Sequence, residues 1–114
     1  MAKYERRITG DFSQLCSFCH EAILHSSGSA SYEDGSEYTL GDVRVAVNVY
    51  ERYSIIGSNR VSMNVTIVGE GDNLFLSAIT SGGSQAMFFK LNTFGEGSFL
   101  DTLIDAVEKH YPRR

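Results

Sequence analysis

The segment Cys16-Ser17-Phe18-Cys19-His20 combines residue types that could support three kinds of chemistry. Two cysteines followed by a histidine match the C-x-x-C-H pattern that attaches c-type haem through two thioethers and an axial imidazole. The same two thiols could form a redox-active dithiol, and with the imidazole they supply three of the four ligands of a zinc site. Which of these uses is open to the segment depends on the element that carries it.

The expected position of the two cysteines argues against all three uses. Apolar residues recur every three or four positions over residues 12 to 25, which predicts an amphipathic helix with Asp11 as its N-cap. Cys16 and Cys19 fall on the apolar stripe, where cysteine behaves as a small hydrophobe, and Cys16 lies beyond the first turn, where the helix dipole no longer acts. Haem attachment of this kind belongs to exported proteins, and we expect no signal peptide here. The remaining histidines do not have zinc-finger spacing, so we predict no metal and no cofactor.

A second group of candidate residues is polar and lies on two predicted strands and a loop. Antiparallel pairing brings Arg52 and Arg60 to the same end of their strands, close to the ring of Tyr50. Two guanidinium groups beside an aromatic ring can bind a carboxylate, a phosphate or an acidic patch on a partner. The loop 81–85 adds hydroxyl and amide donors. The predicted ligand-binding residues are Tyr50, Arg52, Arg60, Ser81, Ser84 and Gln85.

A solvated sheet face and an ordinary hairpin turn would explain the same residues without any ligand. An exposed surface of tyrosine and arginine is also typical of protein interfaces, so this polar face could serve self-association. The residues alone leave these alternatives open.

The strands that position these residues show a regular apolar alternation. The apolar side chains at every second position are Val43, Val45, Val47 and Val49 in one strand and Val61, Met63, Val65 and Ile67 in the next. Because side chains alternate between the two faces of a strand, each row lies on one side of a sheet. We predict that both rows share one face, covered by helices, and that the polar residues between them line the other face.

The rest of the chain completes a single α+β domain over residues 1–114. Residues 30–40 predict one strand with a bulge near Asp34-Gly35, and a final helix follows Ser98, with Asp101 completing a capping box and Pro112 ending it. We predict a two-layer fold in the order β-α-β-β-β-β-β-α. About six antiparallel strands, the last over residues 86–91, form a sheet with both helices packed on one face. The arrangement resembles the helix-grip architecture of lipid- and hormone-binding proteins.

Composition narrows the classes of partner. The chain has 114 residues, a net charge of −4, 42% hydrophobic residues and 21% charged residues, which is typical of an ordinary globular domain. Its basic residues are scattered, whereas binding to nucleic acid or to an anionic membrane needs clustered lysine and arginine. No apolar run reaches the length of about 20 residues that spans a membrane. We therefore expect a cytoplasmic protein with reduced cysteines, without nucleic-acid or membrane partners.

Several stretches resemble a family of small bacterial domains of unknown function. The stretches that carry the likeness are Tyr50-Glu51-Arg52-Tyr53-Ser54, Asn59-Arg60-Val61-Ser62, residues 78–86 and Phe88-Phe89-Lys90. The likeness extends over nearly the whole chain and implies a compact cytoplasmic α+β domain. It implies no activity and assigns no functional residue.

We favour a non-enzymatic binding or interaction module, which forms a homodimer or takes a small amphipathic ligand between sheet and helices. The alternatives are a small enzyme that uses Arg52, Arg60 and the Ser81–Gln85 region, or a redox protein that uses the Cys16/Cys19 dithiol.

Overall fold

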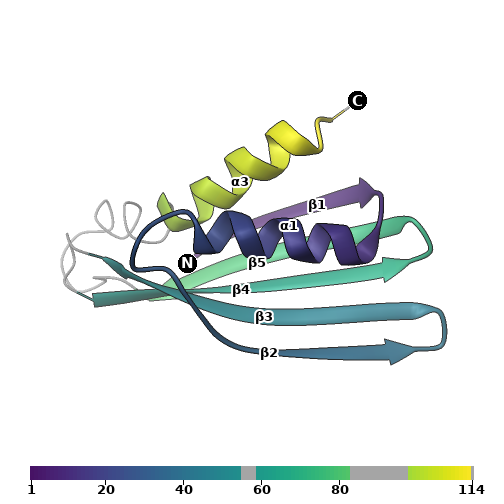
Figure 1. Cartoon of the computed structure of the whole chain (residues 1–114), viewed down its shortest axis with the longest axis horizontal. Helices are drawn as coiled ribbons and strands as arrows, with labels where there is room; N and C mark the ends of the chain where they lie inside the picture. The colour runs from purple at the N-terminus through teal and green to yellow at the C-terminus, as the bar shows by residue number, and fades with distance from the viewer. Residues whose placement is uncertain (55–58, 83–97, 114) are drawn as a thin grey trace.

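The computed structural model describes residues 1–54, 59–82 and 98–113, which form a five-stranded antiparallel sheet and two helices (Figure 1). The strand order in the sheet is β1-β5-β4-β3-β2, so β4 is central and β1 and β2 are the edges. The elements are β1 (Ala2–Thr9), α1 (Phe12–Leu24), β2 (Ser31–Leu40), β3 (Val43–Ser54), β4 (Asn59–Glu70), β5 (Asn73–Gly82) and α3 (Ser98–His110). The α+β class is confirmed. The predicted sixth strand over residues 86–91 lies outside the described residues.

Two tight hairpins set the pairing of the sheet. Two-residue turns join β2 to β3 and β4 to β5, because Leu40 pairs with Val43 and Glu70 pairs with Asn73. Each turn begins with a glycine at φ +59°, Gly41 or Gly71, in the left-handed region that two-residue hairpin turns require. The first strand returns along the outer side of β5, so the N-terminal segment closes one edge of the sheet.

The predicted bulge in the second strand is confirmed. The register of β2 on β3 shifts between Tyr32, which pairs with Tyr50, and Asp34, which pairs with Val49. One extra residue on the edge strand forms the bulge, and the strand continues through the turn-prone Asp34-Gly35 pair. Because of this shift, Tyr32 and Tyr38 lie on opposite faces of the sheet.

Both helices pack on the same face of the sheet (Figure 1). The Asp11 side chain caps α1 by accepting a hydrogen bond from the backbone N–H of Gln14 at 2.9 Å, as the sequence predicts. The helices contact each other and cover the row of β4 that begins with Val61 and ends with Ile67. Gly69 continues this row, and a Cβ there would lie 2.7 Å from the Phe12 ring, so the absent side chain lets the start of α1 approach the sheet.

The prediction that the valine row of β3 lies under the helices is wrong. Val45 pairs with Val68, and Ala46 pairs with Ile67, so the odd positions of β3 share a face with the even positions of β4. The covered positions of β3 are therefore the even ones, which include the buried Ala46 and Tyr50. The four valines lie on the opposite face and are only half-buried.

A polar cluster ties α3 to the edge strand β1. The Arg6 side chain is buried, and its guanidinium donates to Glu108 Oε2 at 2.7 Å and to the Tyr111 carbonyl oxygen at 2.9 Å. The Tyr4 hydroxyl donates to the same carboxylate oxygen, and Arg113 donates to Oε1 at 3.1 Å. The hydrogen bonds from Tyr4, Arg113 and Arg6 lower the pKa of Glu108 to about 2.

This cluster predicts how stability changes in acid. A carboxyl group whose pKa is lowered on folding stabilises the protein above its unfolded-state pKa, near 4.5, and that contribution disappears as the pH falls toward about 2. We expect Glu108→Gln to lower the free energy of unfolding in urea at pH 7, by an amount that shrinks steadily between pH 4.5 and pH 2.5. The control is Asp105→Asn, an exposed acid one turn earlier on the same helix, which should show little effect at any pH. A deficit of equal size at pH 7 and pH 2.5 would contradict this role of Glu108.

Candidate functional site

The sheet separates the two arginines that the sequence places in one binding site. Arg52 pairs with Val61, while Arg60 pairs with Tyr53, so both lie at the same end of the sheet but on opposite faces. Arg52 shares the helix-covered face with Tyr50. Arg60 shares the other face with Ser81, because the Ser62 that follows it on that face pairs with Ser81. The expectation of a joint site is wrong in this respect, and Ser84 and Gln85 lie outside the described residues.

On the covered side, Tyr50 is part of the core. Its side chain is 1% exposed, and its hydroxyl lies 2.9 Å from Nδ1 of His20 on α1. Burial raises the pKa of Tyr50, so the phenol keeps its proton in this hydrogen bond with the imidazole. The Tyr50 ring also contacts the rings of His20 and Tyr32. These contacts join α1 to β3 and the edge strand β2 rather than leaving Tyr50 free for a ligand.

Arg52 has a similar structural contact at the end of β3. Its guanidinium lies over the ring of Phe99, 4.8 Å from the centroid, and burial lowers its pKa. A cation above an aromatic face is attracted by the ring's electron density. Arg52 thereby connects β3 with the first turn of α3.

On the other side, Arg60 and Ser81 form ordinary surface contacts. Arg60 lies 3.3 Å from a carboxylate oxygen of Glu51, and the hydroxyls of Ser62 and Ser81 lie 3.2 Å apart. An exposed ion pair of this kind contributes between about 0 and 1 kcal/mol. The first pair links β4 with β3, and the second links β4 with β5.

The cysteines of the opening motif lie on α1 as predicted and are free thiols. Cys19 is 1% exposed and belongs to the core, and Cys16 is half-buried against it. Burial raises the pKa of Cys19 to about 12 and that of Cys16 to about 11, with Glu37 adding to the effect at Cys16. Thiols with such pKa values hold almost no thiolate near neutral pH, which is the opposite of what redox catalysis requires.

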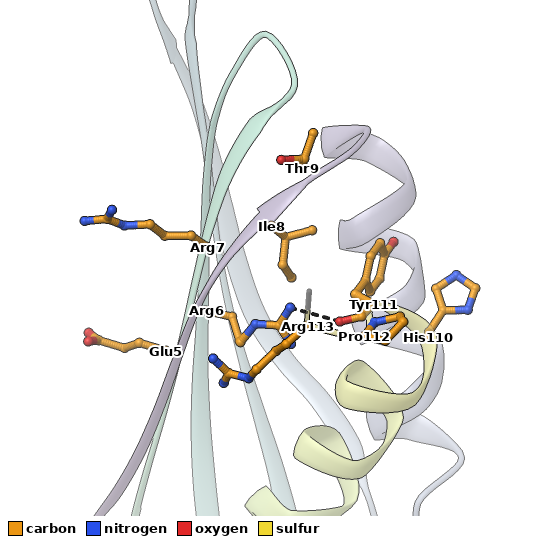
Figure 2. Close-up of a pocket in the computed structure, with 9 residues that line it drawn as sticks. All are labelled: Glu5, Arg6, Arg7, Ile8, Thr9, His110, Tyr111, Pro112 and Arg113. Atoms are coloured by element: carbon orange, nitrogen blue, oxygen red, sulfur yellow. Dashed lines mark hydrogen bonds between the residues drawn. The ribbon is translucent and has the colours of Figure 1, made fainter.

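A hollow lies between β1 and the end of α3 (Figure 2). It has a volume of about 840 Å³, and residues 5–9 and 110–113 line it. Figure 2 shows the Arg6 side chain directed toward the C-terminal residues, whereas Glu5 and Arg7 extend from the other face of the strand. The Arg6 guanidinium in this hollow already has partners inside the protein, since it donates to Glu108 and to the Tyr111 carbonyl oxygen. The hollow thus contains a structural tie between two elements.

The feature that the sequence analysis missed is the apolar character of the sheet face on which neither described helix packs, which we call the uncovered face. Its apolar side chains are Tyr38, Leu40, Val43, Val45, Val47, Val49, Tyr53, Val68, Phe75 and Ile79. Among the described residues, seven large hydrophobic side chains are exposed, and five of them lie here, with Tyr38 at 64% and Leu40 at 65%. Exposed apolar side chains gathered on one face favour an interaction site there.

The uncovered face has a hollow at its hairpin end. The hollow has a volume of about 530 Å³, and Val43, Val68 and Phe75 form its apolar floor with Arg7 and Glu70 among the polar residues around it. The apolar character of this face depends on the register between β3 and β4, in which Ser54 pairs with Asn59 across an even number of residues. An even connection pairs odd with even positions and so separates the two apolar rows.

The environment of the thiols predicts their reactivity. Iodoacetamide reacts with thiolates, so in the folded protein at pH 7.5 we expect both Cys16 and Cys19 to stay unmodified for hours, and both to react within minutes in urea. Intact-protein mass spectrometry counts the added groups. Rapid modification of either thiol in the folded protein would favour the dithiol chemistry instead.

Among the described residues, no helix is long and apolar enough to cross a membrane. No curated protein matches the chain. The model of one protein family, described as a family of unknown function (DUF6054), matches residues 1–111. Because this match extends over nearly the entire sequence, the protein belongs to the DUF6054 family of unknown function.

Proposed function

We propose that this domain is a non-enzymatic interaction module that forms a homodimer through the uncovered face of its sheet. The observation that carries the proposal is the asymmetry between the two sheet faces. One face is buried under two helices, while the other exposes five large hydrophobic side chains around a row of half-buried valines. Antiparallel sheets with one free face normally present alternating polar residues there, so this apolar surface calls for a second layer.

The size of the face fits a stable dimer. Five strands about 4.8 Å apart span about 24 Å, and β4 extends about 27 Å from Ser62 to Glu70, at about 3.4 Å per residue. Stacking two such faces would bury roughly 650 Å² on each copy, or roughly 1,300 Å² in total. Specific interfaces bury at least about 1,000 Å². The whole face is needed to reach this area, which favours another flat sheet as the occupant.

The charges on the uncovered face favour a second copy over other partners. Its β1 edge carries Lys3, Glu5 and Arg7, and its β2 edge carries Asp34, so the surface contains both signs and can complement itself. A nucleic acid or an anionic membrane would be matched by one positive sign across the face. The two free thiols agree with a cytoplasmic location in this proposal.

The other predicted uses have less support. The space between sheet and helices is filled by side chains that are almost fully buried, including Leu15, Met63 and Leu103, whereas the described hollows lie at the sheet edge and outside this core. An enzyme that uses Arg52 and Arg60 together would have to bridge the two faces of the sheet.

A paired substitution on β2 tests the proposal. Tyr38 and Leu40 lie on the uncovered face, while Glu37 and Thr39 are exposed on the same strand and point to the other face. In a symmetric dimer each lost side chain is removed twice, so we expect the double variant Tyr38→Ser/Leu40→Ser to weaken dimerisation by about 100-fold or more. Sedimentation velocity measures the equilibrium, and circular dichroism confirms that the fold is intact.

The matched control is Glu37→Ser/Thr39→Ser, which should dimerise like the unchanged protein. The proposal would be wrong if the unchanged protein stays monomeric at millimolar concentration, or if the two double variants weaken dimerisation equally.

A further inference from the structure

We infer that two copies stack face to face about a two-fold axis parallel to the strands, so that β1 of each copy lies over β2 of the other. This inference rests on the proposed function, since it specifies how that dimer is arranged. A symmetric dimer uses the same surface on both copies, and this restricts the ways in which two flat sheets can stack.

When the strands of the two sheets are aligned, two symmetric stackings bury the whole uncovered face. If the axis runs parallel to the strands, the strand order reverses between the copies, and β4 lies over β4, β5 over β3 and β1 over β2. If the axis runs across the strands, each strand lies over its own counterpart in the opposite direction. The pairing registers connect the side chains into rows across the sheet, so each stacking predicts definite neighbours.

The charges of the edge strands distinguish the two stackings. When the axis crosses the strands at the middle row of the face, which contains Glu5, Lys3 approaches Arg7 of the partner and the two Glu5 side chains face each other. When the axis runs along the strands, Lys3 instead approaches Asp34 of the partner, because these residues occupy the two ends of one row. Like charges placed opposite each other are unfavourable, so the edges favour the parallel axis over an axis that crosses the strands at this row.

The apolar row and the hollow agree with the same axis. One row runs from Arg7 through Phe75, Val68 and Val45 to Tyr38. In the parallel-axis dimer, Phe75 packs on Val45 of the partner, the two Val68 side chains meet at the axis, and Tyr38 lies over Arg7 of the partner. The highly exposed Tyr38 ring then points toward the hollow that Phe75 and Val68 line, with the Arg7 guanidinium available to its ring face.

The twist of the sheets modifies these contacts without removing them. Stacked sheets cross at about 30°, which displaces an edge strand lying about 10 Å from the axis by about 5 Å. The long side chains of Lys3 and Arg7 cover such a displacement. The arrangement also brings Glu70 near its own counterpart and Arg60 near its own, but both lie at the ends of β4 where solvent screens them, and Arg60 is paired with Glu51.

Charge reversal at the two edges tests the axis. We expect Lys3→Glu and Asp34→Lys each to weaken dimerisation by about tenfold, since each creates two like-charge contacts. The double variant Lys3→Glu/Asp34→Lys should recover dimerisation to within about threefold of the unchanged protein, because the pair is restored with its signs exchanged. Glu37→Lys, the same change in charge on the other face of β2, is the control and should have no effect. The axis across the strands predicts the opposite result for Lys3→Glu, which would then face Arg7 and tighten the dimer.

A cross-linking experiment tests the axis independently of charge. Glu5 and Ser36 occupy the two ends of the middle row. With a short bis-maleimide, an equimolar mixture of Glu5→Cys and Ser36→Cys proteins should give cross-linked dimers, while each variant alone and the unchanged protein should give none. Cross-linking of Glu5→Cys alone would establish the axis across the strands and overturn the inference.

Different results would overturn the proposed dimer and the proposed direction of its two-fold axis. A protein that never dimerises overturns the proposed function together with the inference. A protein that dimerises and is weakened by Tyr38→Ser/Leu40→Ser supports the proposed function. If that protein is unaffected or strengthened by Lys3→Glu, the parallel axis alone is wrong.

Discussion

The register between β3 and β4 is the constraint on which the rest of this structure depends. Ser54 pairs with Asn59, and from this pair onward every odd position of β3 lies beside an even position of β4. The apolar row of the central strand β4 therefore packs against the helices, while the valines of the neighbouring strand β3 lie on the opposite face. A shift of one residue would place the valines under the helices and would expel Tyr50 and Arg52, with the contacts that they make to α1 and α3.

Most of the polar side chains that could take part in chemistry instead hold the helices and the sheet together. His20 binds Tyr50, Arg52 lies on Phe99, and Arg6 binds Glu108 and the end of α3. Each contact places a polar or charged group at the boundary of the core and satisfies it there, which avoids the cost of burying it unpaired. The helix-covered face thus combines an apolar centre with polar ties at its margins. Within the described residues, the surface that such ties leave unused is the uncovered face.

Much of the architecture follows from local sequence patterns. The Asp11 cap, the helical stripe with Cys19 and the bulge near Asp34 all depend on a few neighbouring residues, and each appears in the structure as predicted. The assignment of faces does not follow in this way, because it depends on which residues of two strands stand opposite each other. Alternation shows that Val43 and Val45 share a face, yet it does not relate that face to the one that Val61 occupies. The same limit separates two residues of the candidate site, since Arg52 and Arg60 are close along the sheet but lie on opposite sides of it.

The central claim is that the β3 valines form a contact between two copies of the chain rather than part of the core. An isotope-filtered NOE spectrum of a mixture of labelled and unlabelled protein tests it most directly, because it records only contacts between copies. The account predicts intermolecular NOEs to the methyl groups of Val45, Val47 and Val68, and none to those of Val61 and Val65 under the helices. Intermolecular NOEs confined to helix residues, or none at concentrations at which the protein is dimeric, would contradict it.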